Sequence, residues 1–297
     1  MRVLGGQLAK FLVLCICLCG YLVAMPLGAI ETVRYVSSKQ YPDKKSIYFE
    51  QLLKLILEKT AAEFGPYQLE PVAIEMAQER TSMMLEKNEF IDITWRMTSL
   101  QLEQKLQAVY LPLLKGVMGY RIFIIRRGEQ PSFDNVKTLE QLKHMTAGQG
   151  YNWADSQILK HNGFNLVEGY DIYLLNMLAR KRFDYYPRAL HEPWLEIADK
   201  EQFQIEQNLL LKYPSPIYFF VNKQNQTLAK RLSTGLKTLV DSGEFELFFQ
   251  NHPMTQDILQ RSRLNQRRVF ELSNPVISAE TTNLLNDTRL WIDPSKP

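Results

Sequence analysis

The sequence predicts an α/β fold made of two units, with the second unit inserted into the first. Two observations carry this prediction. Strand and helix patterns alternate twice along the chain, and the chain passes between the two alternations near residues 116–119 and again near 213–217. Such alternation is typical of parallel sheets joined by right-handed crossovers. The helices predicted after residue 224 have no strands of their own, so they must return to the first unit.

The first unit is predicted to contain strands at 31–38, 67–74 and 90–95 and helices at 48–65 and 77–88. In the longer helix the apolar residues keep the spacing of one helical face, namely Phe49, Leu52, Leu53, Ile56 and Leu57. Gly65-Pro66 is expected to end this helix, because proline cannot continue it.

The second unit is predicted to have strands at 119–127, 145–150, 164–169, 183–187 and 203–213, and helices at 138–145, 153–163, 171–182 and 189–200. A strand at 214–223 leads back to the first unit. A helix beginning near Gln226 follows, with an apolar stripe at Leu228, Leu232, Leu236, Leu239 and Val240. The predicted domains are residues 30–117 with 217–297 for the first lobe, and 118–216 for the second.

Residues 1–29 have the pattern of a cleaved secretory signal peptide. Arg2 and Lys10 precede the short apolar core "FLVLCICLCGYLVA", and "PLGA" supplies small residues for a cut after Ala29, with Ala24 as the second choice. The core is shorter than a membrane helix of about 20 residues, although a retained anchor is the alternative. All 3 cysteines lie in this segment, so the mature chain is expected to have no disulfide and no Cys–metal site.

The charge balance argues against nucleic acid as a partner. The chain has 35 Lys and Arg residues against 32 Asp and Glu residues, a formal net charge of +3. Nucleic-acid-binding domains usually carry a pronounced basic stripe instead.

Candidate binding residues follow the predicted strands, because ligands of open parallel sheets bind beyond the carboxyl ends of the strands. These residues are aromatic, charged or polar: Trp95, Arg96, Thr98, Gln149, Tyr151, Trp153, Arg188 and Glu192. Together they offer stacking faces and charged hydrogen-bonding groups, which suit a small polar ligand.

Several of these residues have a purely structural alternative. Trp95 is equally compatible with a place in the core, and "GQG" before a helix is either a tight turn or an anion-binding turn. Arg188 has a possible salt-bridge partner in Glu192, four residues on.

Signatures of enzymes and metal sites are missing. His191 beside Glu192 suggests metal or acid–base chemistry, but no HExxH motif follows, since Leu195 stands where the second histidine would be. The sequence contains no GxSxG motif and no P-loop, and the mature chain would contain no cysteine nucleophile. We therefore expect a protein that is not an enzyme and uses no metal or cofactor.

Three stretches carry a resemblance to a known family: "LPLLKGVMGYRIFIIRRG", "TLEQLKHMTAGQG" and "PSPIYFFVNKQNQTLAKRLSTGLKTLVDSGEFELFF". With the signal peptide and the split first unit, residues 31–252 resemble the type II periplasmic solute-binding proteins. The nearest branch is the amino-acid-binding-like family 3 of the substrate-binding proteins of ABC transporters. The resemblance implies a two-lobed Venus flytrap fold that closes on a small molecule.

The chain departs from the family pattern at three positions. Family members usually have an Arg shortly after "MT" that holds the ligand carboxylate, whereas here Arg96 precedes that motif. They have Gly-Thr or Gly-Ser where this chain has Gly150-Tyr151. They often have an Asp for the ligand amine where this chain has "PRA" at 187–189. These departures argue against a standard α-amino acid as the ligand.

We therefore expect a periplasmic, monomeric binding protein that captures a small polar solute, anionic or zwitterionic, and delivers it to an ABC importer. Closure of the lobes on the ligand would stabilise the bound state. A partner of a membrane sensor kinase or chemoreceptor is the alternative. An enzyme that uses His191 and Glu192, or a family member with only a structural role, are further hypotheses.

Overall fold

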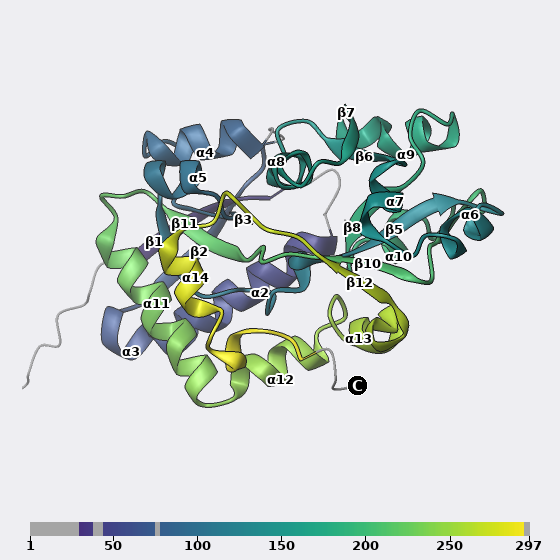
Figure 1. The fold of residues 1–297 in the computed structure, drawn as a ribbon. Helices are drawn as coiled ribbons and strands as arrows, with labels where there is room; N and C mark the ends of the chain where they lie inside the picture. Colours follow the sequence, from purple (N-terminus) through teal and green to yellow (C-terminus); the bar gives the residue numbers. More distant parts are fainter. Residues whose placement is uncertain (1–29, 38–43, 75–77, 294–297) are drawn as a thin grey trace, which may run out of the picture.

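A computed structural model describes residues 30–37, 44–74 and 78–293. The predicted signal peptide, residues 1–29, lies outside the described residues. Those residues form two lobes, each built around its own sheet (Figure 1). Within the described ranges no helix combines the length and the apolar character that crossing a membrane requires.

The first lobe is built on a mixed sheet with the strand order β2-β1-β3-β11-β4. Its strands are β1 (Glu31–Val36), β2 (Tyr67–Val72), β3 (Ile93–Met97), β4 (Gln107–Val109) and β11 (Ile217–Val221). β1 pairs in parallel with β2 and β3, as predicted. β11 returns from the second lobe and runs antiparallel between β3 and β4.

Helices cover both faces of this sheet. They are α2 (Lys44–Lys59), α3 (Ala61–Phe64), α4 (Gln78–Glu86), α5 (Leu100–Lys105), α11 (Gln226–Asp241) and α12 (Glu244–Asn251). Side chains of a strand point alternately to its two faces. Accordingly, Phe219 and Val221 of β11 pack with α2 and α11, whereas Tyr218 and Phe220 share a cluster with residues of α4 and α5.

The second lobe contains a sheet with the order β12-β10-β5-β8, and β9 also pairs with β5. Its strands are β5 (Tyr120–Arg126), β8 (Tyr186–Ala189), β9 (Phe203–Ile205), β10 (Leu209–Lys212) and β12 (Arg268–Glu271). The pair β6 (Thr146–Gly150) and β7 (Asn165–Gly169) adjoins it through a bridge between Ala147 and Tyr185. The helices are α6 (Gln130–Asp134), α7 (Leu139–Lys143), α8 (Ala154–His161), α9 (Asp171–Ala179) and α10 (Pro193–Glu196).

Two chain segments connect the lobes and run side by side. The 3-10 helix η1 (Val117–Gly119) leads into β5, and residues 213–217 lead back into β11. The Tyr213 N–H donates to the Gly119 carbonyl oxygen at 2.9 Å. A Cβ atom on Gly119 would lie 2.1 Å from the Tyr213 carbonyl oxygen, so the close approach of the two segments requires glycine.

Two predicted elements are shorter than expected. The helix predicted at 189–200 is reduced to α10, which begins at Pro193, a residue favoured at a first helical position because it lacks an N–H. The strand predicted at 203–213 is divided into β9 and β10 by the buried Glu206. The Glu206 carboxylate accepts the N–H groups of Asn208 and Leu209 at 2.8 and 2.7 Å, which turns the chain.

The C-terminal segment departs from the predicted lobe boundaries. We expected all of 217–297 in the first lobe, but β12 pairs in parallel with β10 and so belongs to the second sheet. Leu272 and Phe270 pack into the second-lobe core, which explains this placement. α13 (Ile258–Ser262) and η2 (Leu264–Gln266) precede β12, and α14 (Ala279–Leu284) and η3 (Thr288–Leu290) follow it. The chain thus passes between the lobes two further times.

Candidate functional site

A cleft of about 770 Å³ is lined by residues of both lobes. The first lobe contributes residues of α4, β3 and α5. The second lobe contributes residues of β5 and β8, the starts of α8 and α9, and the turn before α10. A cleft of this size and mixed lining is typical of small-molecule sites.

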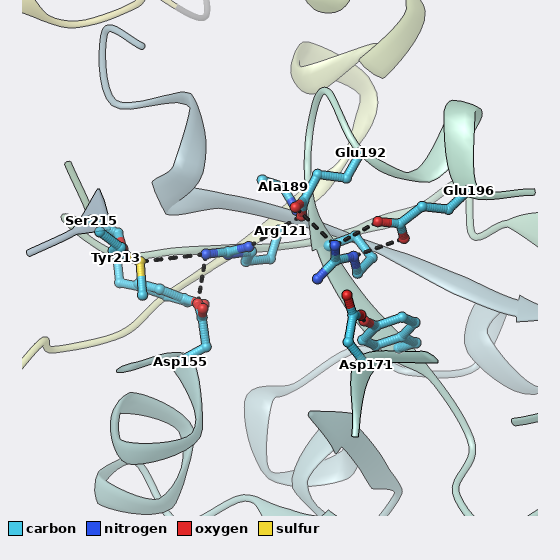
Figure 2. Close-up of polar contacts among 11 residues, drawn as sticks. Arg121, Asp155, Asp171, Ala189, Glu192, Glu196, Tyr213 and Ser215 are labelled. Atoms are coloured by element: carbon cyan, nitrogen blue, oxygen red, sulfur yellow. Dashed lines mark hydrogen bonds and ion pairs between the residues drawn. The ribbon is translucent and has the colours of Figure 1, made fainter. Parts of the chain in front are cut away.

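Two arginines approach the cleft from opposite faces of the second sheet. Arg121 of β5 pairs with Ala189 of β8, and Arg188 pairs with Ile122, so the two side chains lie on opposite faces. Glu192, just beyond β8, contacts both arginines, and Figure 2 shows its carboxylate beside Arg121. Its Oε1 accepts a hydrogen bond from Arg188 Nη2 at 2.8 Å, and its Oε2 is 3.7 Å from Arg121 Nη1.

The Arg188 side chain is buried in a charged and aromatic setting. Its Nε and Nη2 donate to the Glu196 carboxylate at 2.8 and 2.5 Å. Its guanidinium lies 5.1 Å from the ring centroid of Trp153 and 4.9 Å from that of Tyr186. Burial acts to lower the pKa of Arg188, but Glu192, Tyr186 and Glu196 act to raise it, and the pKa lies well above its ordinary value. Arg188 is therefore a permanent cation.

Arg121 lies beside the segments that connect the lobes. Its Nη2 is 2.6 Å from Asp155 Oδ1, and the Tyr213 hydroxyl donates to the same oxygen at 2.5 Å. Nη2 also lies 3.7 Å from Met97 Sδ in the first lobe. Burial raises the pKa of Tyr213 well above its usual value, so Tyr213 stays a neutral donor. The buried Arg121 Nε has no hydrogen-bond partner among the described residues.

The first-lobe wall combines aromatic side chains with charged ones. Trp95 stacks on Phe49 with ring centroids 5.5 Å apart and planes inclined by 19°. Arg96 lines the cleft as well, but it ties β3 to α4. Its Nη1 donates to the Gln78 carbonyl oxygen at 3.0 Å and to Ser82 Oγ at 2.5 Å. Burial lowers the pKa of Arg96.

The cleft brings together part of the predicted set, namely Trp95, Arg96, Trp153, Arg188 and Glu192. The remaining three predicted residues are not in its lining. Thr98 is buried and donates to Glu103, and Gln149 is fully buried. The ring of Tyr151 is exposed and packs edge-on against Tyr170, with centroids 5.3 Å apart.

The structural alternatives proposed for two residues are also visible. Arg188 does form the salt bridge with Glu192 and lines the cleft at the same time. Trp95 packs against the first-lobe core and also lines the cleft. Each of the two residues therefore has a structural contact and also lines the cleft.

Sequence reasoning missed Arg121, Asp155 and Asp171, which also line the cleft. Arg121 is a charge near the start of the strand "YRIFIIR", directly before the apolar run "IFII", and a charge in that position was a signal that could have been used. Asp155 and Asp171 occupy the first turns of α8 and α9, where a carboxylate is also expected for helix capping. Their position in a first helical turn therefore gave no separate sign of a place in the cleft.

No cluster of three or more His, Cys, Asp or Glu side chains suited to a metal occurs within residues 30–37, 44–74 and 78–293. His191 lines the cleft beside Glu192. Glu192 Oε2 accepts the Ala189 N–H at 2.8 Å while Oε1 accepts from Arg188, so this carboxylate serves to position Arg188.

Of the comparisons with known proteins, the one with solved structures shows the fold. No protein-family model matches the sequence, and no curated protein matches it significantly. Among solved structures, a Salmonella typhimurium periplasmic binding protein with high arginine specificity is similar with a TM-score of 0.55 and 12% identity, over 74% of this chain and 98% of that one. A probable amino-acid ABC transporter extracellular-binding protein from Bacillus subtilis gives 0.54 and 17%, over 74% and 97%. A histidine kinase sensor domain with similarity to periplasmic binding proteins gives 0.53 and 17%, over 74% and 94%.

Proposed function

We propose that this chain, which has the two-lobed fold of periplasmic binding proteins, captures a small zwitterionic solute in its cleft and delivers it to an ABC importer. The cleft with lining residues from both lobes supports capture by closure. The amino-acid-binding proteins among the similar structures support a solute-binding role rather than an enzymatic one.

One observation carries the zwitterionic assignment: the second-lobe wall has spare hydrogen-bonding capacity of both signs. Among the described residues, Arg188 Nη1 donates no hydrogen bond, and Arg121 Nη1 has the ion pair with Glu192 at 3.7 Å but no hydrogen bond. Asp155 Oδ2 and Asp171 Oδ2 accept none from the same residues. An anionic ligand group would meet the arginine donors, and a cationic group would meet the aspartates.

A purely anionic ligand fits this wall less well. Arg188 is already paired with Glu192 and Glu196, and Arg121 with Asp155. Asp171 adds a further carboxylate to the lining. A ligand with only negative charge would therefore face surplus carboxylates, which raises the free energy of its bound state.

Mass spectrometry of small molecules released from the purified protein tests the proposal, followed by calorimetric titration of each molecule found. We expect a zwitterion, and we expect Asp155→Asn to weaken its binding by about 1–3 kcal/mol, because one charged hydrogen bond is lost. Asp199→Asn is the matched control, because that carboxylate is exposed and its ion pair is with the neighbouring Lys200, away from the cleft lining. A purely anionic ligand would refute the charge assignment, and turnover of the ligand would refute the binding role.

The likeness to a histidine kinase sensor domain favours a second candidate, in which the loaded protein signals to a membrane sensor. Crosslinking of the loaded protein in membranes distinguishes the two, since capture of a permease supports import and capture of a kinase or chemoreceptor supports sensing.

Location and oligomeric state belong to the same proposal, namely a periplasmic monomer released by cleavage after Ala29. N-terminal sequencing of the exported protein tests the cleavage. A sequence that begins upstream of residue 25 would contradict it.

A further inference from the structure

The C-terminal segment after α12, residues 252–293, leaves the first lobe at His252, whose ring contacts Tyr48, and then attaches to the second lobe. Arg261 of α13 lies 4.8 Å from the ring centroid of Trp194 in α10. The Arg267 Nη1 donates to the carbonyl oxygens of Glu206 and Leu209 at 2.7 and 3.0 Å. β12 then adds four backbone-paired residues along β10. This attachment therefore involves side chains, backbone and core packing together.

The segment next passes between the lobes along the two connecting segments already described. Asn162 of the second lobe donates to the Ser273 carbonyl oxygen at 2.8 Å. Asn274 donates to the carbonyl oxygen of Pro214, which belongs to a connecting segment, at 2.7 Å. The Leu100 N–H at the start of α5 in the first lobe donates to the Val276 carbonyl oxygen at 2.7 Å. Residues 273–276 thus bond in turn to the second lobe, the connection and the first lobe.

The segment ends attached to the first lobe. Thr281 of α14 shares a hydrogen bond with the Tyr218 hydroxyl of β11 at 3.1 Å. The Ile292 N–H donates to the Lys115 carbonyl oxygen at 2.8 Å. The buried Lys115 ammonium donates to the Arg289 carbonyl oxygen at 2.6 Å and pairs with Glu246 of α12 at 2.6 Å. Both ends of the passage are therefore fixed.

We propose that residues 252–293 act as a strap that limits how far the two lobes rotate against each other. Two connecting segments in contact behave as one hinge, about which the lobes can both bend and twist. A third passage beside them, bonded on both sides and in its middle, makes a three-stranded band. Twisting such a band shears the bonds of Ser273, Asn274 and Val276, so the strap favours bending over twisting. The strap rests on the proposed function only in that closure of the cleft captures the ligand.

Distance distributions between two spin labels test the strap in the ligand-free protein. A chain that begins at Ile30 has no cysteine. Lys87→Cys in the first lobe and Asn176→Cys in the second therefore give two exposed, unique labelling positions. The labelled parent is compared with a chain that ends at Asn274 and with the full-length Asn274→Ala variant. Asn251→Ala is the matched control, because its side chain donates to the Leu247 carbonyl oxygen within the same helix, α12.

We expect the parent and the control to give one narrow distribution of the distance between the two labels. Both strap variants should give a broader distribution, with added population away from the distance seen in the parent. If the truncated chain does not fold, as judged by loss of a cooperative thermal transition, Asn274→Ala decides alone. A folded Asn274→Ala variant with the parent's distribution would overturn the proposal. The measurement uses no ligand, so failure to find a zwitterion leaves this test intact.

Discussion

Arg231 in the first lobe and Arg188 in the second are both buried, but they bond to different kinds of partner. Arg231 donates from Nη2 to the carbonyl oxygens of Leu57 and Gly65 at 3.1 and 3.0 Å, and from Nε to Thr60 Oγ1 at 3.0 Å. Its Nη1 donates to Glu31 at 2.7 Å. All three of its nitrogens are thereby used.

Arg188, in contrast, pairs with two carboxylates, and its Nη1 has no hydrogen bond to any residue that the structure describes. Arg188 also lines the cleft. The comparison indicates that a buried arginine bonded mostly to uncharged backbone groups holds elements together. One bonded to ionised side chains beside a cleft keeps a charge available for a ligand. Four variants test this contrast and the walls and core around it, ordered from the largest to the smallest expected change in the free energy of unfolding.

The largest effect is expected for Arg188→Ala. It should lower the free energy of unfolding by about 3–5 kcal/mol, because Glu192 and Glu196 are left charged in a buried setting without their cation. Denaturant titration measures the loss. Adding Glu192→Gln and Glu196→Gln should restore part of the stability, since the uncompensated charges are then removed. A loss below about 1 kcal/mol would match an exposed salt bridge instead.

Arg231→Ala should lower the free energy of unfolding by less than Arg188→Ala does, about 2–3 kcal/mol, because most of the groups it leaves unpaired are uncharged. Its more informative readout is ligand affinity, which should stay unchanged once the protein is folded, whereas Arg188→Lys should weaken it. Calorimetry with the ligand recovered from the purified protein provides the comparison. Equal losses of affinity in both variants would remove the distinction between the two arginines.

Trp95→Leu tests the aromatic part of the first-lobe wall. It should lower the free energy of unfolding by about 1 kcal/mol beyond the effect of the lost buried area, because the stack on Phe49 is also lost. Because Trp95 itself is uncharged, the variant should leave the order of preference among zwitterions of different charge spacing unchanged. Phe219→Leu on the same sheet, which contacts Trp95 edge-on, is the control for packing alone. A change in the order of ligand preference would assign recognition to the first lobe.

The smallest effect concerns His252, a neutral buried group of the first lobe. Burial lowers the pKa of His252 below 6.5, and its Nδ1 accepts the Met254 N–H at 3.0 Å. The unfolded chain binds the proton more readily, so this contribution to stability is complete above the unfolded pKa and is lost as the pH falls below about 6.5.

The buried arginines keep their charge over this range, and the difference between the parent and a His252 variant separates the contribution of His252 from that of the other histidines. The amide oxygen of His252→Asn can accept the same N–H, but the amide does not titrate. The variant should therefore flatten the pH dependence of the free energy of unfolding, measured by denaturant titration between about pH 7.5 and 5.5, a range around the ordinary histidine pKa. An identical pH dependence in parent and variant would contradict this contribution of His252.

Local periodicity was sufficient to predict much of the first lobe. The apolar face of α2 and the leucine stripe of α11 were read from helical spacing, and those residues are buried. The two connections between the lobes were also predicted, because strand patterns stop and restart around them. These features depend on neighbours in the sequence, which is why the sequence alone was informative.

The charged wall and the last pairing of the tail depend on contacts between distant residues. Glu192 contacts both Arg121 and Arg188 only because β5 and β8 pair antiparallel, and no spacing in the sequence records that register. Likewise, "RVFE" at 268–271 is too short to be recognised as a strand, and β10 supplies its partner. Pro193 was visible in the sequence and should have shortened the helix predicted around it.

The position of β11 between β3 and β4 has a consequence for the order in which the chain folds. β4 pairs only with β11 among the described strands, and β11 follows the whole second lobe in sequence. The bond from Arg231 to Glu31 likewise joins residues 200 positions apart. Contacts this distant in sequence form slowly, since a long loop must close first. We therefore expect the central part of the second lobe, whose strands from β5 to β10 are contiguous in the chain, to become compact before the first sheet is complete.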